Sequence, residues 1–322
     1  MVRKNLDGFG VGLMLLLCMI WGLQQVAIKA VAHDLSPLMQ VGFRSGLSAL
    51  LVGAVMVARK ERFSLSDGTL APGLVAGLLF AAEFLFVAKG LTLTTASHMA
   101  VFLYTSPIFT ALGLHLRLPA ERLSARQWGG IGIAFCGTVT AFAGGLLHGG
   151  ITPQMLLGDC FGILAGASWG TTTVVIRCSA LSEAASAKTL LYQLAVACTA
   201  LLTYALLTGQ FGVAAMTGAA WGSLLFQAVV VSFASYLAWF WLLRRYLASR
   251  LSAFSFMTPL FGVSFGVLLL HEPLDGFFAA GAILVLMGIT LVSLRGSTAG
   301  RVAEDVCPLS ELEDGKSPLS PL

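Results

Sequence analysis

Ala96–Glu121, ASHMAVFLYTSPIFTALGLHLRLPAE, is the stretch that decides the fold, because its pattern returns as Ala248–Glu272, ASRLSAFSFMTPLFGVSFGVLLLHE. Both copies begin with Ala-Ser, place a proline eleven residues further on and end with glutamate. The offset between the copies is 152 residues at the Ala-Ser and proline positions and 151 at the glutamate. A nearly constant offset of this kind indicates an internal duplication.

The same offset extends to both sides of this stretch. Trp21-Gly22 matches Trp169-Gly170 at an offset of 148 residues. Further pairs at offsets of 148 to 151 residues are Gly10 and Gly158, Lys29 and Arg177, Gly130 and Gly281, and Gly137 and Gly288. We therefore predict two related units, residues 1–148 and 149–295, followed by a polar, disordered tail at 296–322 that is rich in Ser, Pro and Glu.

The composition indicates an integral membrane protein. Of the 322 residues, 57% are hydrophobic and only 11% are charged, whereas a soluble domain carries about 25% charged residues. The apolar runs are long enough to cross a bilayer, which takes roughly 20 helical residues. The ten candidate spans are 9–30, 36–58, 70–89, 95–116, 126–146, 153–177, 186–208, 217–243, 250–271 and 274–294. The predicted fold is an all-α membrane protein with ten transmembrane helices.

The distribution of lysine and arginine predicts the orientation. With the N-terminus inside, sixteen of the nineteen basic residues fall in inner segments, and only Lys29, Arg44 and Lys89 do not. Because inner loops are usually the positive ones, we expect both termini in the cytoplasm and a multi-pass protein in the cell (inner) membrane. Each unit has five spans, an odd number, so the second unit must enter the membrane from the opposite side.

An inverted repeat of this kind is typical of transporters that work by alternating access. Two copies of one structure that face opposite ways can exchange conformations, which opens a central site to either side of the membrane. A passive channel and a non-transporting scaffold or regulatory protein remain as alternatives.

The duplicated residues resemble the EamA family of the drug/metabolite transporter (DMT) superfamily. They are Trp21-Gly22, Ala96-Ser97, Pro107, Glu121 and Gly130 in the first unit, and Trp169-Gly170, Ala248-Ser249, Pro259, Glu272 and Gly281 in the second. The resemblance covers about residues 9–295. It implies a secondary transporter, commonly an exporter of amino acids, other metabolites or toxic compounds, and it leaves the substrate open.

Ionisable residues inside membrane spans are costly, which makes them functional candidates. Glu83 is the only carboxylate well inside an apolar run, and we expect it to bind a proton or the substrate. Arg44, in the second span, is a candidate anchor for a substrate carboxylate. The alternatives for Glu83 are a structural ion pair with Arg44 or Lys89 and a position that faces a water-filled vestibule. Arg44 could instead pair with Glu83. His98 would titrate near neutral pH; the alternative is a hydrogen-bonded structural histidine.

Aromatic side chains at mid-depth suit the binding of an organic solute. The predicted binding residues besides Arg44, Glu83 and His98 are Trp21, Gln24, Tyr104, Trp169, Tyr236 and Trp239. Pro107 and Pro259 each remove a backbone hydrogen bond within a span, and we predict that they kink matching helices as paired gates. The alternative is that these aromatic residues and prolines only fill space and pack helices.

Other sequence features bear on packing and on the excluded functions. Gly158, Gly162, Gly166 and Gly170 form one face of a helix, which predicts either close packing against a neighbour or a surface along which that neighbour slides. Neither HExxH nor GxxxxGK[ST] occurs, so we expect no metalloprotease chemistry and no ATP-driven pumping. We expect no enzymatic activity, no cofactor and no metal site. The expected partners are a small-molecule substrate, the lipid bilayer and protons, with no nucleic acid.

Overall fold

The computed structural model describes residues 4–61, 64, 66–94, 99, 102–141, 143, 152–209, 213–270 and 276–293. These residues are almost entirely helical, and the extended pairings among them are two isolated bridges, Lys4–Tyr246 and Leu35–Val213. The predicted tail, His98 and Glu272 lie outside the described residues.

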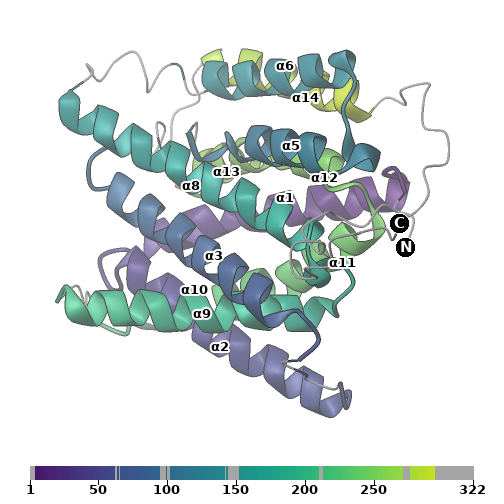
Figure 1. Ribbon diagram of the computed structural model, residues 1–322. Helices are drawn as coiled ribbons and strands as arrows, with labels where there is room; N and C mark the ends of the chain where they lie inside the picture. The colour runs from purple at the N-terminus through teal and green to yellow at the C-terminus, as the bar shows by residue number, and fades with distance from the viewer. Residues whose placement is uncertain are drawn as a thin grey trace, which may run out of the picture.

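Helices from the two halves of the chain lie side by side throughout the molecule (Figure 1). In the first half they are α1 Gly8–Ala30, α2 Pro37–Ala58, α3 Leu70–Gly90, α5 Ser106–Arg117, the short η1 Pro119–Glu121 and α6 Ala125–Ala141. In the second half they are α8 Pro153–Arg177, η2 Ala180–Ser182, α9 Ser186–Leu207, α10 Gly218–Leu225, the π-helix η3 Phe226–Ser235, α11 Tyr236–Arg245, α12 Ala248–Phe254, α13 Met257–Leu270 and α14 Gly276–Ser293.

Six helical stretches among the described residues are long and apolar enough to cross a membrane. They are Gly8–Ile28, Pro37–Ala58, Leu70–Gly90, Pro153–Arg177, Ser186–Leu207 and Gly218–Arg245. These six agree with predicted spans 1, 2, 3, 6, 7 and 8. The fourth and ninth predicted spans are not single continuous helices in the structure. In the fourth, helix α5 begins at Ser106, and in the ninth, α12 and α13 are separate helices. The count of ten transmembrane helices stays a prediction.

Polar caps define where several long helices begin. Ser36 accepts a hydrogen bond from the backbone N–H of Met39 at the start of α2, and Thr152 accepts one from Met155 at the start of α8. Each cap is followed directly by a proline, which lacks the N–H that the first helical position would leave unpaired. The local sequence thus fixes the first turn of both helices.

Glycines bring helices of the two halves into direct backbone contact. Figure 1 shows α6 and α14 side by side in a layer of their own, next to α5 and α13. A Cβ atom added at Gly137 of α6 would lie 2.6 Å from the backbone N of Val285 in α14. Real Cβ atoms do not approach other atoms so closely, so the α6–α14 packing depends on glycine at this position.

The duplicated Trp-Gly positions serve the same purpose in α1 and α8. A Cβ added at Gly22 would lie 2.8 Å from the backbone N of Gly262 in α13, and one added at Gly170 would lie 2.6 Å from the Cβ of Phe109 in α5. The other members of the glycine ladder are equally crowded: a Cβ added at Gly158, Gly162 or Gly166 would lie 2.7, 2.7 or 2.5 Å from an atom of Thr94, Phe102 or Thr105, respectively. The prediction that this ladder is a packing surface is confirmed.

We predict that Gly137→Ala destabilises the protein, because the new methyl group must displace the α14 backbone. Overpacking of this kind costs about 1–3 kcal/mol, which lowers the thermal unfolding midpoint in detergent. Gly132→Ala is the matched control in the same helix, since no atom lies within 4 Å of its added Cβ and alanine favours the helix. Equal midpoints for the two variants would contradict the close α6–α14 contact.

Candidate functional site

Arg44 is the most unusual side chain in the interior. It lies in the middle of α2 and is 0% exposed, and its guanidinium carbon lies 4.8 Å from the centre of the Phe84 ring on α3. None of its three guanidinium nitrogens makes a hydrogen bond of good geometry to the described residues, although the Tyr236 hydroxyl and the Glu83 carboxylate both approach the group. A buried cation without well-placed acceptors is costly, so this position is suited to bind an anionic group.

Glu83 approaches Arg44 from α3 without pairing with it. Its side chain is buried, and the two charges attract each other, yet no direct hydrogen bond joins them. The predicted alternative of a closed Arg44–Glu83 ion pair therefore does not describe this conformation. A cation and a carboxylate that lie near each other but remain apart offer two opposite charges to a ligand.

Aromatic rings connect this charged pair to α1 and α11. The ring centres of Phe80 and Phe84 are 5.1 Å apart, and those of Phe80 and Tyr236 are 6.0 Å apart, both edge to face. Trp21 of α1 packs edge to face against Tyr236 at 6.4 Å and against Trp239 at 5.7 Å. Arg44 also interacts electrostatically with the Tyr236 hydroxyl, so charge and rings belong to one region.

Tyr104 and Trp169 bring two further helices to this region. Their ring centres are 5.8 Å apart, edge to face, and Tyr104 interacts electrostatically with both Glu83 and Tyr236. We call the set Trp21, Arg44, Glu83, Tyr104, Trp169, Tyr236 and Trp239 the central cluster. It joins seven of the predicted binding residues. Gln24 is buried on α1, and His98 lies outside the described residues.

Both predicted proline kinks coincide with a break in the helix. Tyr104 and Thr105 form a turn directly before α5, in which Pro107 occupies the first turn. Ser255 and Phe256 form the matching turn between α12 and α13, close before Pro259. Discontinuous helices are common at the binding sites of transporters, and here one break carries a member of the central cluster, Tyr104.

A polar seam between α2 and the π-helix η3 went unnoticed in the sequence. Gln227 donates to the Gln40 side chain at 2.7 Å, and the Ser48 hydroxyl donates to the backbone O of Ala228 at 2.8 Å. The Ser232 hydroxyl and the Gln227 carbonyl oxygen are buried without partners among the described residues. π-Helices are rare and often mark functional sites. Serine and glutamine inside apolar spans are the sequence signal for this seam, and they are weaker indicators of function than ionisable residues.

Two GxSxG runs, at residues 166–170 and 262–266, do not form hydrolase sites. Ser168 and Ser264 each donate to the backbone carbonyl four residues earlier, at 2.8 Å, in the middle of α8 and α13. A hydrolase nucleophile of this motif lies instead on a sharp turn between a strand and a helix.

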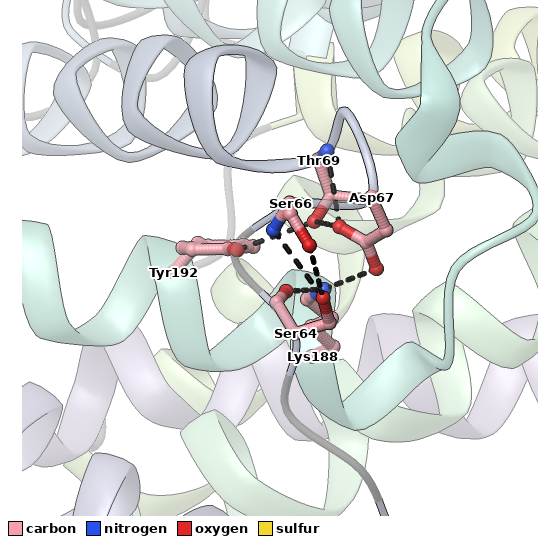
Figure 2. Close-up of polar contacts among 6 residues, drawn as sticks. All are labelled: Ser64, Ser66, Asp67, Thr69, Lys188 and Tyr192. Atoms are coloured by element: carbon pink, nitrogen blue, oxygen red, sulfur yellow. Dashed lines mark hydrogen bonds and ion pairs between the residues drawn. The ribbon is translucent and has the colours of Figure 1, made fainter.

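A second polar network lies away from the central cluster, where the α2–α3 connection meets α9. Figure 2 shows Lys188 and Tyr192 of α9 facing the loop residues Ser64, Asp67 and Thr69. The Lys188 ammonium group lies 2.5 Å from a carboxylate oxygen of Asp67, and the Thr69 hydroxyl lies 3.2 Å from that of Tyr192. The network fastens a loop of the first half to a helix of the second.

Comparison with known proteins shows the family. A profile described as the EamA-like transporter family matches residues 8–143 and 156–294. This chain belongs to that family. The EamA resemblance predicted from the duplicated motifs is confirmed, as is the expectation of a membrane protein of transporter type.

Relatives with transporter names align along most of the chain. The "Uncharacterized transporter YoaV" of Bacillus subtilis is 25% identical over 84% of this chain and 92% of its own length. A "Probable amino-acid metabolite efflux pump" of Salmonella typhimurium is 27% identical over 90% of this chain and 94% of its own length. A protein of known structure described only as "Crystal structure of protein" shares the fold, with a TM-score of 0.72, 15% identity and coverage of 88% and 96%. These names indicate transport and not enzymatic catalysis.

The Figure 2 network predicts a specific response to acid. The hydrogen bond from the Lys188 ammonium group, helped by Thr69, lowers the pKa of the Asp67 carboxyl from 3.8 to about 2. Its stabilising contribution is therefore complete above pH 3.8 and disappears as the pH falls through about 2. We predict that Asp67→Asn has a lower thermal midpoint than the wild type at pH 6 and loses less stability between pH 4 and 2. An identical acid response in both proteins would contradict this assignment.

Proposed function

We propose that this EamA-family chain is a secondary transporter that exports small organic solutes, such as amino acids or related metabolites, by alternating access coupled to protons. The observation that carries the proposal is the buried Arg44 guanidinium, which makes no hydrogen bond of good geometry to the described residues and lies beside Glu83 within the central cluster. The names of the efflux-pump relatives agree with such a substrate class.

The charges of the central cluster suit a zwitterion. A substrate carboxylate takes the place of the missing acceptor on Arg44, where paired N–H donors favour a planar anion. A substrate ammonium group lies against Glu83, and the rings of Trp21, Tyr236 and Trp239 enclose the rest of the molecule. In this arrangement each buried charge gains a partner when the substrate binds.

Glu83 provides the link to protons. When the ammonium group of the substrate leaves, the buried Glu83 carboxylate keeps only the attraction of Arg44, to which it is not hydrogen-bonded, and it takes up a proton in this medium of low dielectric constant. The next substrate releases this proton when it binds. One proton then moves inward for each substrate that moves outward, which is the direction in which a bacterial proton gradient drives export.

The duplicated architecture supports alternating access. The family profile matches the chain in two successive segments. The contact of Gly22 with Phe261 and Gly262 has its counterpart in the contact of Gly170 with Phe109 and Thr110. We include in the proposal the ten helices in two inverted units, 1–148 and 149–295, with both termini in the cytoplasm and the gating roles of Pro107 and Pro259.

We predict that Glu83→Gln abolishes transport driven by a pH gradient while membrane insertion is unaffected, because an amide cannot exchange a proton. The measurement is uptake of a panel of labelled amino acids and related solutes into proteoliposomes, with and without a pH gradient. Glu61→Gln is the matched control, because Glu61 follows α2 outside the membrane-crossing helices. Uphill accumulation separates a carrier from a channel, and no flux of any solute would favour the scaffold.

Arg44 allows a test in which stability and binding move in opposite directions. We predict that Arg44→Met raises the thermal midpoint of the ligand-free protein, because it removes a buried charge that makes no hydrogen bond of good geometry to the described residues. The same change weakens the binding of carboxylate-bearing solutes by about 30-fold or more, as expected for the loss of charged hydrogen bonds. Arg59→Met, at the exposed end of α2, is the control for general charge effects. Retained carboxylate binding in Arg44→Met would exclude Arg44 as the anchor.

A further inference from the structure

Glu121 is a buried carboxylate that the proposed binding site does not use. It ends the short helix η1 between α5 and α6 and is 1% exposed. Its Oε1 atom accepts hydrogen bonds from Arg177 Nη2 at 2.6 Å, from Arg177 Nε at 3.2 Å and from the backbone N of Ala248 at 3.0 Å. Its Oε2 atom accepts from the backbone N of Ser249 at 3.2 Å and from the Ser249 hydroxyl at 2.7 Å.

These five hydrogen bonds join three elements. Arg177 is the last residue of α8, and Ala248 and Ser249 are the first two residues of α12, whose N–H groups have no acceptor within their own helix. The carboxylate therefore satisfies the exposed end of α12 and the guanidinium group of α8 at once. Arg250 of α12 adds a further electrostatic attraction. Charge-assisted hydrogen bonds of this kind are about twice as strong as neutral ones.

α12 is a short helix with a non-helical segment at each end. All seven of its residues are buried. Tyr246 and Leu247, before it, have extended backbone conformations, and the turn at Ser255 and Phe256, after it, separates it from α13. A short helix between two such segments can move as a unit while the helices on either side keep their shape.

The far end of α12 reaches the edge of the central cluster. The backbone O of Phe254, its last residue, accepts a hydrogen bond from the Cys18 thiol at 3.3 Å. Cys18 is completely buried in α1 and interacts electrostatically with Tyr104 of the central cluster. α12 therefore extends from the end of the molecule that carries Arg177, Arg244 and Arg245, which we call the basic end, to the edge of the central cluster.

We propose that Glu121 is a latch that holds α12 against α8 and keeps the basic end of the central cluster closed. Opening this end requires the Glu121 carboxylate to release Arg177 and Ser249 together, so that α12 moves away from Cys18. The latch rests on the proposed transport function, because it assigns one step of the alternating-access cycle to a defined ion pair.

The N-terminal segment strengthens the same junction from another direction. The backbone N of Lys4 donates to Arg245 O at 3.0 Å, and the backbone N of Leu247 donates to Lys4 O at 3.2 Å. The Tyr246 hydroxyl donates to the Asp7 carboxylate at 2.7 Å. These bonds hold the residues before α12 but not α12 itself, so they leave its release to Glu121.

Cys18 is a native reporter for the latch. The test uses a variant that keeps Cys18 and has the other five cysteines replaced by serine. A membrane-impermeant maleimide reacts with its thiol only when Cys18 becomes exposed, so the labelling rate reports the fraction of molecules in the open conformation. The reagent is added to either face of oriented membrane vesicles. We expect Glu121→Gln to raise the labelling rate at least about tenfold from the basic end, as loss of charged hydrogen bonds predicts, and to leave labelling from the opposite face unchanged.

Two further variants keep the test independent of folding. Ser249→Ala removes the hydroxyl bond and retains the ion pair, and we expect a smaller increase of about threefold. Glu183→Gln is the control, an exposed carboxylate that follows η2 at the same end, and it should label like the parent protein. An unchanged labelling rate in Glu121→Gln would overturn the latch. Equal acceleration of labelling from both faces would also overturn it, because it would mean that the whole protein had become less stable.

The outcomes also separate the latch from the proposed function. If the parent protein accumulates substrate and Glu121→Gln labels like the parent, the latch is wrong and the transporter stands. If Cys18 labelling responds as expected and the parent protein transports nothing, the conformational latch stands and the proposed function is wrong.

Discussion

Inside a bilayer no water solvates a polar group, so each buried N–H, C=O and charge must find its partner within the protein. The interior of this chain follows that constraint closely at the contacts between its halves. Gln40 and Gln227 pair with each other, the Ser48 hydroxyl takes up the Ala228 carbonyl of the π-helix, and Glu121 accepts five hydrogen bonds. Against this background Arg44 stands out, because all three of its guanidinium nitrogens lack a hydrogen bond to the described residues, whereas Gln227 and Ser232 each leave a single neutral oxygen unsatisfied. An anionic ligand would satisfy the guanidinium group.

The same constraint explains how the broken helices are tolerated. A proline removes one backbone donor, and the turn before it changes the bonding of the neighbouring carbonyls, which in lipid need acceptable partners within the protein. At the break before α13, the Phe254 carbonyl accepts the Cys18 thiol. At the break before α5, the Thr105 hydroxyl donates to the Phe102 carbonyl at 2.6 Å. Irregular backbone at this depth is thus satisfied within the protein, next to Tyr104 of the central cluster.

The class of fold and the most charged part of the candidate site could both be predicted from the sequence. Apolar runs separated by short polar gaps leave few solutions other than membrane helices, and glycines at constant offsets mark the close helix contacts. Arg44 and Glu83 were found because a charge inside an apolar run is rare. The EamA family was recognisable because Ala-Ser, proline and glutamate recur together in one order.

Other features depend on contacts between distant residues, which no local pattern encodes. The π-helix has a sequence as apolar as an ordinary helix, and its polar seam appears only when α2 is packed against it. Glu121 and Ser249 were both visible as motif residues. Their hydrogen bond joins positions 128 residues apart, and the duplication alone matched Glu121 with Glu272 instead. The length of a continuous helix was also overestimated near Pro107 and Pro259, because hydropathy does not register a break in the backbone.

Arg44 and Glu121 together suggest why the proposed transporter does not remain in one state. Glu121 gains its five donors only while the basic end is closed, and this favours the closed conformation of the empty protein. Arg44 gains acceptors only when an anionic ligand is bound, so binding adds a free-energy change that the empty protein lacks. A ligand shifts a conformational equilibrium only by the difference between its affinities for the two states. Substrate binding must therefore be tighter in the conformation in which the Glu121 latch is broken, and the strength of the Arg44 contact has to match the strength of the latch.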